Sequence, residues 1–158
     1  MEDRAVRLLG KIFGGKTRGK CKILVIGLDG VPYSFLSGQI SGGRLPNLAR
    51  LAGEGELREA VSIQPPVSCA AWTSFVTSRN PGKHDIFGFI DRRPGTYDVY
   101  IPSADDIKVQ TIWEWLSRHD RRIAVINVPV SYPPRAVNGV VAVSYTHLRA
   151  HETSLHLV

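Results

Sequence analysis

The chain has 158 residues, of which 43% are hydrophobic and 22% are charged, which is enough for one globular domain with its own core. No apolar run reaches the roughly 18 residues of a membrane-spanning helix, and Arg7 and Lys11 interrupt the N-terminal apolar positions, so we expect neither a membrane span nor a signal peptide. The two cysteines, Cys21 and Cys69, lack metal-type spacing and indicate a reduced, cytoplasmic protein.

The formal charge of +6 is concentrated at the N-terminus. Residues 1–20 contain six basic and two acidic residues, whereas the remaining chain is nearly balanced. A basic face is therefore not implied outside this segment, and we expect no nucleic-acid partner.

Residues 1–20 are predicted to form a basic amphipathic segment followed by a polar linker. Within 4–13 the apolar residues have helical spacing, with basic residues between them. Such a segment either makes a weak contact with an acidic membrane surface or forms a loosely docked terminal helix.

Residues 10–17 match the phosphate-loop pattern G-x-x-x-x-G-K-[ST], but that loop needs a strand before it and a helix after it. Here the order is reversed, so an NTPase is the weakest hypothesis, and Lys16→Ala would test it.

The next part of the chain, 21–141, alternates between strand and helix patterns. The continuous apolar run 23–28 predicts a strand that is covered on both faces, and further strands are expected at 56–63 and 123–128. Helical spacing of apolar residues occurs in three segments, 46–52, 68–77 and 109–118. Residues 80–82 have turn composition, and 88–107 are loop-like. This alternation predicts an α/β fold with a mostly parallel sheet.

Asp29 follows the first predicted strand directly, between Gly27 and Gly30. The carboxyl ends of strands are where an α/β sheet binds its ligands, and a carboxylate suits a hard divalent metal or zinc. The alternative is that Asp29 caps the next helix or turn. Spacing alone does not decide between the two roles.

Ser68 follows Pro65, Pro66 and Val67 and opens a predicted helix. The simplest role for such a serine is an N-cap. A nucleophilic role needs activation, which a metal supplies without a histidine, and a helix N-terminus stabilises an alkoxide or a phosphate. The neighbouring Cys69 lies on a different helix face and is expected to pack rather than react.

Short motifs along 22–141 resemble, in order and spacing, the type I phosphodiesterase/nucleotide pyrophosphatase family of the alkaline phosphatase superfamily. The motifs are VIGLDG at 25–30, LPNLARL at 45–51, PPVS at 65–68, AWTSF at 71–75, and Thr77 with NPGKH at 80–84. Later motifs resemble the branch of predicted phosphohydrolases and phosphomutases: NVPV at 127–130, YPP at 132–134 and VNGV at 137–140.

The resemblance implies a partial three-layer α/β/α sandwich and a phosphoryl-transfer site with two divalent metal ions, zinc first, with manganese or magnesium as alternatives. Asp29 matches the family's first metal ligand. Ser68 matches the residue that contacts the metal and takes the phosphoryl group covalently. The implied substrate is a small-molecule or lipid phosphate ester, and the oligomeric state stays open.

Some residues depart from the family pattern. Nucleotide pyrophosphatases carry Asn-His where Ala71 and Trp72 stand, which puts a nucleotide substrate in doubt. His84 is interpreted as structural, because the family position that it matches lies in a turn. The family's further Asp and His ligands come from downstream sequence, so we expect this chain to be the N-terminal part of a metal-dependent phosphodiesterase or phosphohydrolase and to be inactive by itself. The alternative is a non-catalytic α/β binding domain in which Asp29 and Ser68 are only caps.

Residues 142–158 form a tail that we expect not to be native. The stretch 144–153 resembles a translated sequencing adapter, and we expect the native sequence to end near Val141. The histidines of this tail are His147, His151 and His156. Together with Glu152 they have the spacing of a zinc site, but we assign none because we expect this tail not to be native.

Overall fold

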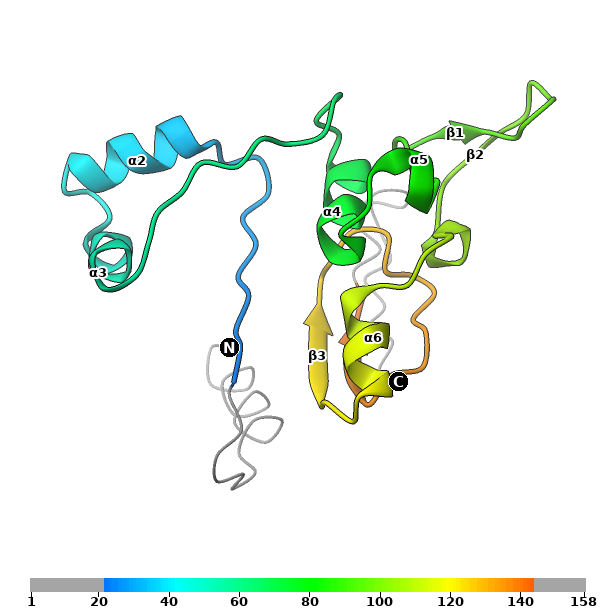
Figure 1. Ribbon diagram of the computed structural model, residues 1–158. Coiled ribbons are helices and arrows are strands. Elements are labelled where there is room, and N and C mark those ends of the chain that lie inside the picture. The colour runs from blue at the N-terminus through cyan, green and yellow to red at the C-terminus, as the bar shows by residue number, and fades with distance from the viewer. Residues whose placement is uncertain (1–21, 144–158) are drawn as a thin grey trace, which may run out of the picture.

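The computed structural model describes residues 22–143 and shows short helices with two small sheets (Figure 1). Residues 1–21 and 144–158 lie outside the described part, and with them the predicted amphipathic segment, the phosphate-loop pattern and the adapter-like histidines. The helices are α2 (Tyr33–Ser41), α3 (Pro46–Glu54), α4 (Ser68–Thr77), α5 (Pro81–His84), the 3₁₀ turn η1 (Ala104–Asp106) and α6 (Ile112–Arg118).

The helix starts follow from local sequence. Proline stands at the first helical position of α3 and α5, where its missing N–H costs nothing. Thr111 and Glu114 form a capping box at the start of α6, in which each side chain accepts from the other's backbone N–H. The helices predicted at 46–52 and 68–77 are therefore confirmed, and the one predicted at 109–118 begins later, at its cap.

Each sheet has two strands. The first is an antiparallel hairpin of β1 (Asp91–Arg92) and β2 (Val99–Tyr100) within the stretch expected to be loop. The second pairs β3 (Ile123–Ile126) with β4 (Gly139–Ala142) in parallel, in register from Ile123↔Gly139 to Ile126↔Ala142. Gly139 has φ 155°, and a Cβ there would overlap the backbone of Ile123, so this close approach requires glycine.

The expectation of a sandwich around a mostly parallel sheet is only partly met. The fold is mixed α/β, and its parallel pair is β3–β4, but residues 22–143 do not form three layers. Residues 23–28 are extended but unpaired, and their apolar side chains are exposed, with Ile23 at 81%. The strand predicted at 56–63 is also irregular. Both predictions were wrong because a strand needs a neighbouring strand for its backbone groups, whatever its own side chains favour.

The core consists of two small clusters of buried apolar residues. Cys69, Ile86 and Ile107 form one beside α4 and α5, and Val125, Val141 and Val143 form the other around β3 and β4. Helices α2 and α3 pack on each other and lie apart from these clusters, with extended chain on either side of the pair (Figure 1). No helix within 22–143 is long and apolar enough to cross a membrane.

Candidate functional site

Asp29 and Ser68, the two residues singled out from the sequence, lie in direct contact. The Ser68 hydroxyl donates to the Asp29 carboxylate, with Oγ at 3.2 Å from Oδ2 and 3.3 Å from Oδ1. Asp29 stands in the turn that ends the extended stretch, and Gly30 completes this turn with φ 70°. The structure therefore brings together a carboxylate and a hydroxyl at the N-terminus of α4.

The double proline determines where α4 begins. A cis peptide bond joins Gln64 to Pro65, and Val67 is the extended residue before the first turn. Ser68 is thus the first helical residue, and its side chain is half-buried. The first-turn N–H groups of a helix have no intrahelical acceptor, so positive potential surrounds the hydroxyl.

Neither side chain acts as a helix cap. The residue before α4 is Val67 and the residue before α2 is Pro32, and neither helix has a side-chain cap. The Ser68 hydroxyl is directed to Asp29 instead. The capping roles that the sequence left open are therefore not what this geometry shows.

Trp72 is the site residue that the sequence interpretation missed. Its indole Nε1–H donates to Asp29 Oδ1 at 3.1 Å. Ser68 and Trp72 are four positions apart on α4 and so share one face of the helix. The Trp72 ring also lies against Gly27, where an added Cβ would be 2.8 Å from Cζ3 and closer still to Cη2. Two signals in the sequence pointed to it: this four-residue spacing, which equally suits an apolar stripe, and the place of Trp72 at a position where nucleotide pyrophosphatases carry histidine.

Cys69 lies next to Ser68 but is part of the core. Its side chain is 7% exposed and packs in the cluster with Ile86 and Ile107. Burial raises the pKa of the thiol, and the negative charges of Asp91 and Asp29 raise this pKa further. The thiolate is therefore disfavoured, as expected for a packing residue.

His84 and Ser74 form a second polar pair, and its geometry is structural. His84 is fully buried, and its Nδ1 accepts from the backbone N–H of Ile86 at 3.2 Å. Nε2 must then carry the hydrogen of the neutral ring and donate to Ser74 Oγ at 2.9 Å. An imidazole in this tautomer cannot take the proton of Ser74, so the pair lacks the arrangement of a nucleophile and its base.

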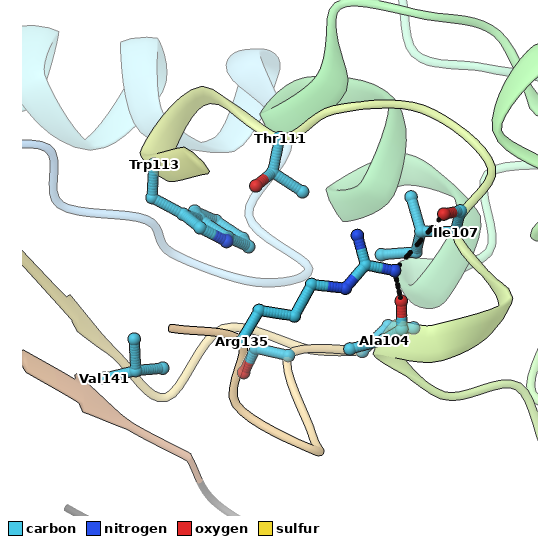
Figure 2. Close-up of a pocket in the computed structure, with 8 residues that line it drawn as sticks. Ala104, Ile107, Thr111, Trp113, Arg135 and Val141 are labelled. Carbon is cyan, nitrogen blue, oxygen red and sulfur yellow. Dashed lines mark hydrogen bonds between the residues drawn. The ribbon is translucent and has the colours of Figure 1, made fainter. Parts of the chain in front are cut away.

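Arg135 is a further polar side chain, and it extends into a small pocket near α6 and η1 (Figure 2). Its guanidinium donates to the carbonyl oxygens of Ala104 and Ile107, and to Glu114 Oε1 at 3.0 Å. The arginine therefore links the backbone around η1 to α6 by hydrogen bonds, and this structural role accounts for its position.

The residues described here supply part of a metal site. Asp29 and Ser68 offer oxygen donors that suit a divalent ion. Within 22–143, however, no group of three or more His, Cys, Asp or Glu residues is placed to hold a metal. These residues therefore do not complete a one-metal or a two-metal centre.

The fold and the site together define a mixed α/β protein with a carboxylate and a serine hydroxyl at the start of a helix. Residues 23–155 match the family model described as "Type I phosphodiesterase / nucleotide pyrophosphatase". The chain therefore belongs to the type I phosphodiesterase/nucleotide pyrophosphatase family, whose members are metal-dependent phosphoesterases. The same comparisons gave no match among curated proteins or solved structures.

Proposed function

We propose that this chain carries the nucleophile and the first carboxylate of a metal-dependent phosphoric ester hydrolase. The observation that carries the proposal is the hydrogen bond from the Ser68 hydroxyl to Asp29, which joins residues far apart in the sequence. Family membership supports a phosphate ester as the substrate. In this proposal Ser68 is the catalytic nucleophile, and Asp29 is both its hydrogen-bond acceptor and a metal ligand.

The proposed reaction has two displacements. Ser68 Oγ attacks phosphorus while its proton passes to Asp29, and the bond from phosphorus to the ester oxygen breaks. The leaving alcohol takes up this proton through solvent, so Asp29 is a carboxylate again before the second displacement. Water then attacks the phosphoserine, which releases the phosphate product and restores the Ser68 hydroxyl. In this proposal the first-turn amides of α4 stabilise the negative charge of the phosphoryl oxygens.

Divalent ions, zinc first or else manganese or magnesium, are proposed to supply additional charge stabilisation when bound. Asp29 and Ser68 would be two of the ligands, and the others would come from polypeptide outside the described residues. We also propose that only the sequence up to about Val141 is native in this chain, and that the genomic locus continues differently after that point. Resequencing that locus tests this part directly, because finding the same codons after residue 141 in an intact gene would refute it.

The proposed substrate class is a small-molecule or lipid phosphate ester. We further propose that the protein acts in the cytoplasm and has no nucleic-acid partner. Family members that act on nucleotides carry Asn-His at the positions of Ala71 and Trp72. In this chain the Trp72 nitrogen is engaged with Asp29. This contact supports a substrate other than a nucleotide. Weak attachment of residues 4–13 to an acidic membrane surface remains part of the proposal, and vesicle co-sedimentation would test it.

The test compares turnover of p-nitrophenyl phosphate and its bis-ester, with zinc, manganese or magnesium, by two proteins. The 158-residue chain is expected to be inactive, and the protein extended by the recovered downstream reading frame is expected to be active. In the extended protein Ser68→Ala should lower kcat by several orders of magnitude. Ser37→Ala, in α2, is the matched control and should leave kcat unchanged.

Acid quenching followed by mass spectrometry should locate phosphate on Ser68 in the extended enzyme. Undiminished turnover by Ser68→Ala, or phosphate on another residue, would refute the nucleophile. Metal-dependent turnover by the 158-residue chain would instead refute the need for further ligands.

A further inference from the structure

We infer that Trp72 is a positioning residue that holds the Asp29 carboxylate in place after Ser68 has become phosphorylated. The inference rests on the proposed function, because it concerns the second of the two displacements. Two side chains of α4, Ser68 and Trp72, donate to the Asp29 carboxylate.

The two donors differ in what the reaction does to them. The Ser68 hydroxyl loses its hydrogen when Oγ bonds to phosphorus, so a phosphorylated Ser68 cannot donate to Asp29 through that oxygen. The indole of Trp72 is a donor only, and it keeps its N–H throughout. Trp72 is therefore the donor that remains when the first step is complete.

The need for a second donor follows from the position of Asp29 itself. The carboxylate is exposed and stands at the end of the extended stretch 23–28, which has no neighbouring strand to support it. A new phosphoryl group on Ser68 would also repel it electrostatically. The Trp72 ring counters both effects because it packs against Gly27, two residues before Asp29, and hydrogen-bonds Oδ1.

The contact pattern also assigns different tasks to the two carboxylate oxygens. Oδ1 accepts from both Trp72 and Ser68, whereas Oδ2 accepts from Ser68 alone. Phosphorylation of Ser68 would leave Oδ1 held by the indole and would free Oδ2. Oδ2 is then the oxygen left open to another partner during the second displacement, while Oδ1 stays fixed by the indole.

The first experiment records the indole Hε1 resonance of Trp72 by ¹⁵N–¹H NMR in the complete 158-residue chain. Trp113→Phe and Trp115→Phe identify the other two indole signals. A hydrogen bond to a carboxylate moves Hε1 downfield, so Asp29→Ala should shift it upfield, whereas the control Asp98→Ala should leave it in place. In Ser68→Ala, which removes the other donor, the signal should stay downfield. An unchanged signal in Asp29→Ala, or loss of the downfield position in Ser68→Ala, would overturn the inference.

The second experiment measures the two displacements separately in the extended enzyme by rapid acid quench. Trp72→Phe should slow phosphoserine hydrolysis by roughly tenfold to a hundredfold, a range typical of residues that hydrogen-bond a metal-ligating side chain and fix its orientation. Phosphoserine should therefore accumulate to a higher level than in the parent enzyme, while its rate of formation changes less. The conservative variant Trp72→His, which restores an N–H, should recover part of the rate.

Equal slowing of both steps, or faster hydrolysis of the phosphoserine, would contradict a role specific to the second step. These outcomes are separable from failure of the proposed function. If no phosphoserine forms at all, the nucleophile is wrong, and the inference about Trp72 falls with it even where the NMR contact is confirmed.

Discussion

Arg135 and Glu114 form an ion pair of 3.0 Å that joins the chain before β4 to the first turn of α6. The same carboxylate completes the capping box, because Glu114 Oε2 accepts from the backbone N–H of Thr111 at 2.8 Å and from its hydroxyl at 2.7 Å. One side chain thus fixes both the start of a helix and the position of the arginine.

Glu114→Gln should lower the free energy of unfolding by about 1–3 kcal/mol, because it weakens charge-assisted hydrogen bonds in a partly buried site. Burial raises the pKa of Glu114, but hydrogen bonds from Thr111 and Arg135 outweigh it and the net pKa lies below the usual 4.5. The stabilisation from the ionised Glu114 is thus present above pH 4.5, and it is lost as pH falls through the lower pKa that Glu114 has in the folded protein. Urea unfolding at several pH values should show the difference between parent and variant shrinking below pH 4.5.

The matched control for that variant is Glu54→Gln, which removes the exposed pair between Arg50 and Glu54 in α3. Its side chains are 62% and 61% exposed, so the change should cost less than about 0.5 kcal/mol. An equal loss in both variants would contradict the special role of Glu114.

His84 should make the protein less stable as the medium becomes acidic. Burial lowers the pKa of His84 below its usual 6.5, and the charge of Asp85 offsets this only in part. The unfolded chain therefore binds a proton at a higher pH than the folded chain, so stability present above pH 6.5 is lost as pH falls toward the folded pKa. One such proton contributes a slope of at most about 1.4 kcal/mol per pH unit.

Urea unfolding of His84→Gln between pH 8 and pH 5 should show a shallower decline than the parent protein. His119→Gln, which changes an exposed histidine at the end of α6, should keep the parent slope. A parent slope retained in His84→Gln would show that other groups cause the acid sensitivity.

Gly27→Ala should separate the stretch 22–28 from α4. A Cβ at this position overlaps the Trp72 ring, and because residue 27 is exposed the backbone can move away, at a cost of about 1 kcal/mol. The Trp72 Hε1 resonance should then lose the downfield shift caused by Asp29. Gly38→Ala in α2 meets no atom within 4 Å and should instead stabilise the helix by about 0.5–1 kcal/mol. An unshifted Hε1 in Gly27→Ala would contradict the contact.

Cys69 should react slowly with thiol reagents in the folded protein. The thiol is buried, and burial raises its pKa, so both access and thiolate are reduced. In a Cys21→Ser background, modification by a disulfide reagent should be about tenfold or more slower without denaturant than in urea. Rapid modification under native conditions would place Cys69 outside the core.

The sequence predicted those elements whose signals are local. The start of α4 was predicted from Pro65 and Pro66. Helix α6 was predicted from apolar spacing with a start at 109, whereas the capping box of Thr111 and Glu114 sets its start at Ile112. Helix α2 was not predicted, because Tyr33–Ser41 contains Gly38 and has no side-chain cap. The short strand β4 was not predicted either, since it begins at a glycine and exists through its pairing with β3.

The site was predictable in part. The family resemblance assigned Asp29 and Ser68 to one metal site, and the structure has the two residues in contact. No sheet edge brings them together, because residues 23–28 form no strand. The roles of the two residues in catalysis and metal binding stay predictions. Trp72 could not be found, because a helical stripe of apolar residues does not reveal that an indole N–H is directed toward a carboxylate.

The unpaired apolar stretch 23–28 has a practical consequence for work with this chain. It combines high β propensity with no charge and no proline, and Leu24, Val25 and Ile26 are each more than 60% exposed. Such a segment is a template for strand pairing between molecules. Concentrated preparations should therefore aggregate through this stretch, and a lysine in place of Val25 should delay the onset of turbidity.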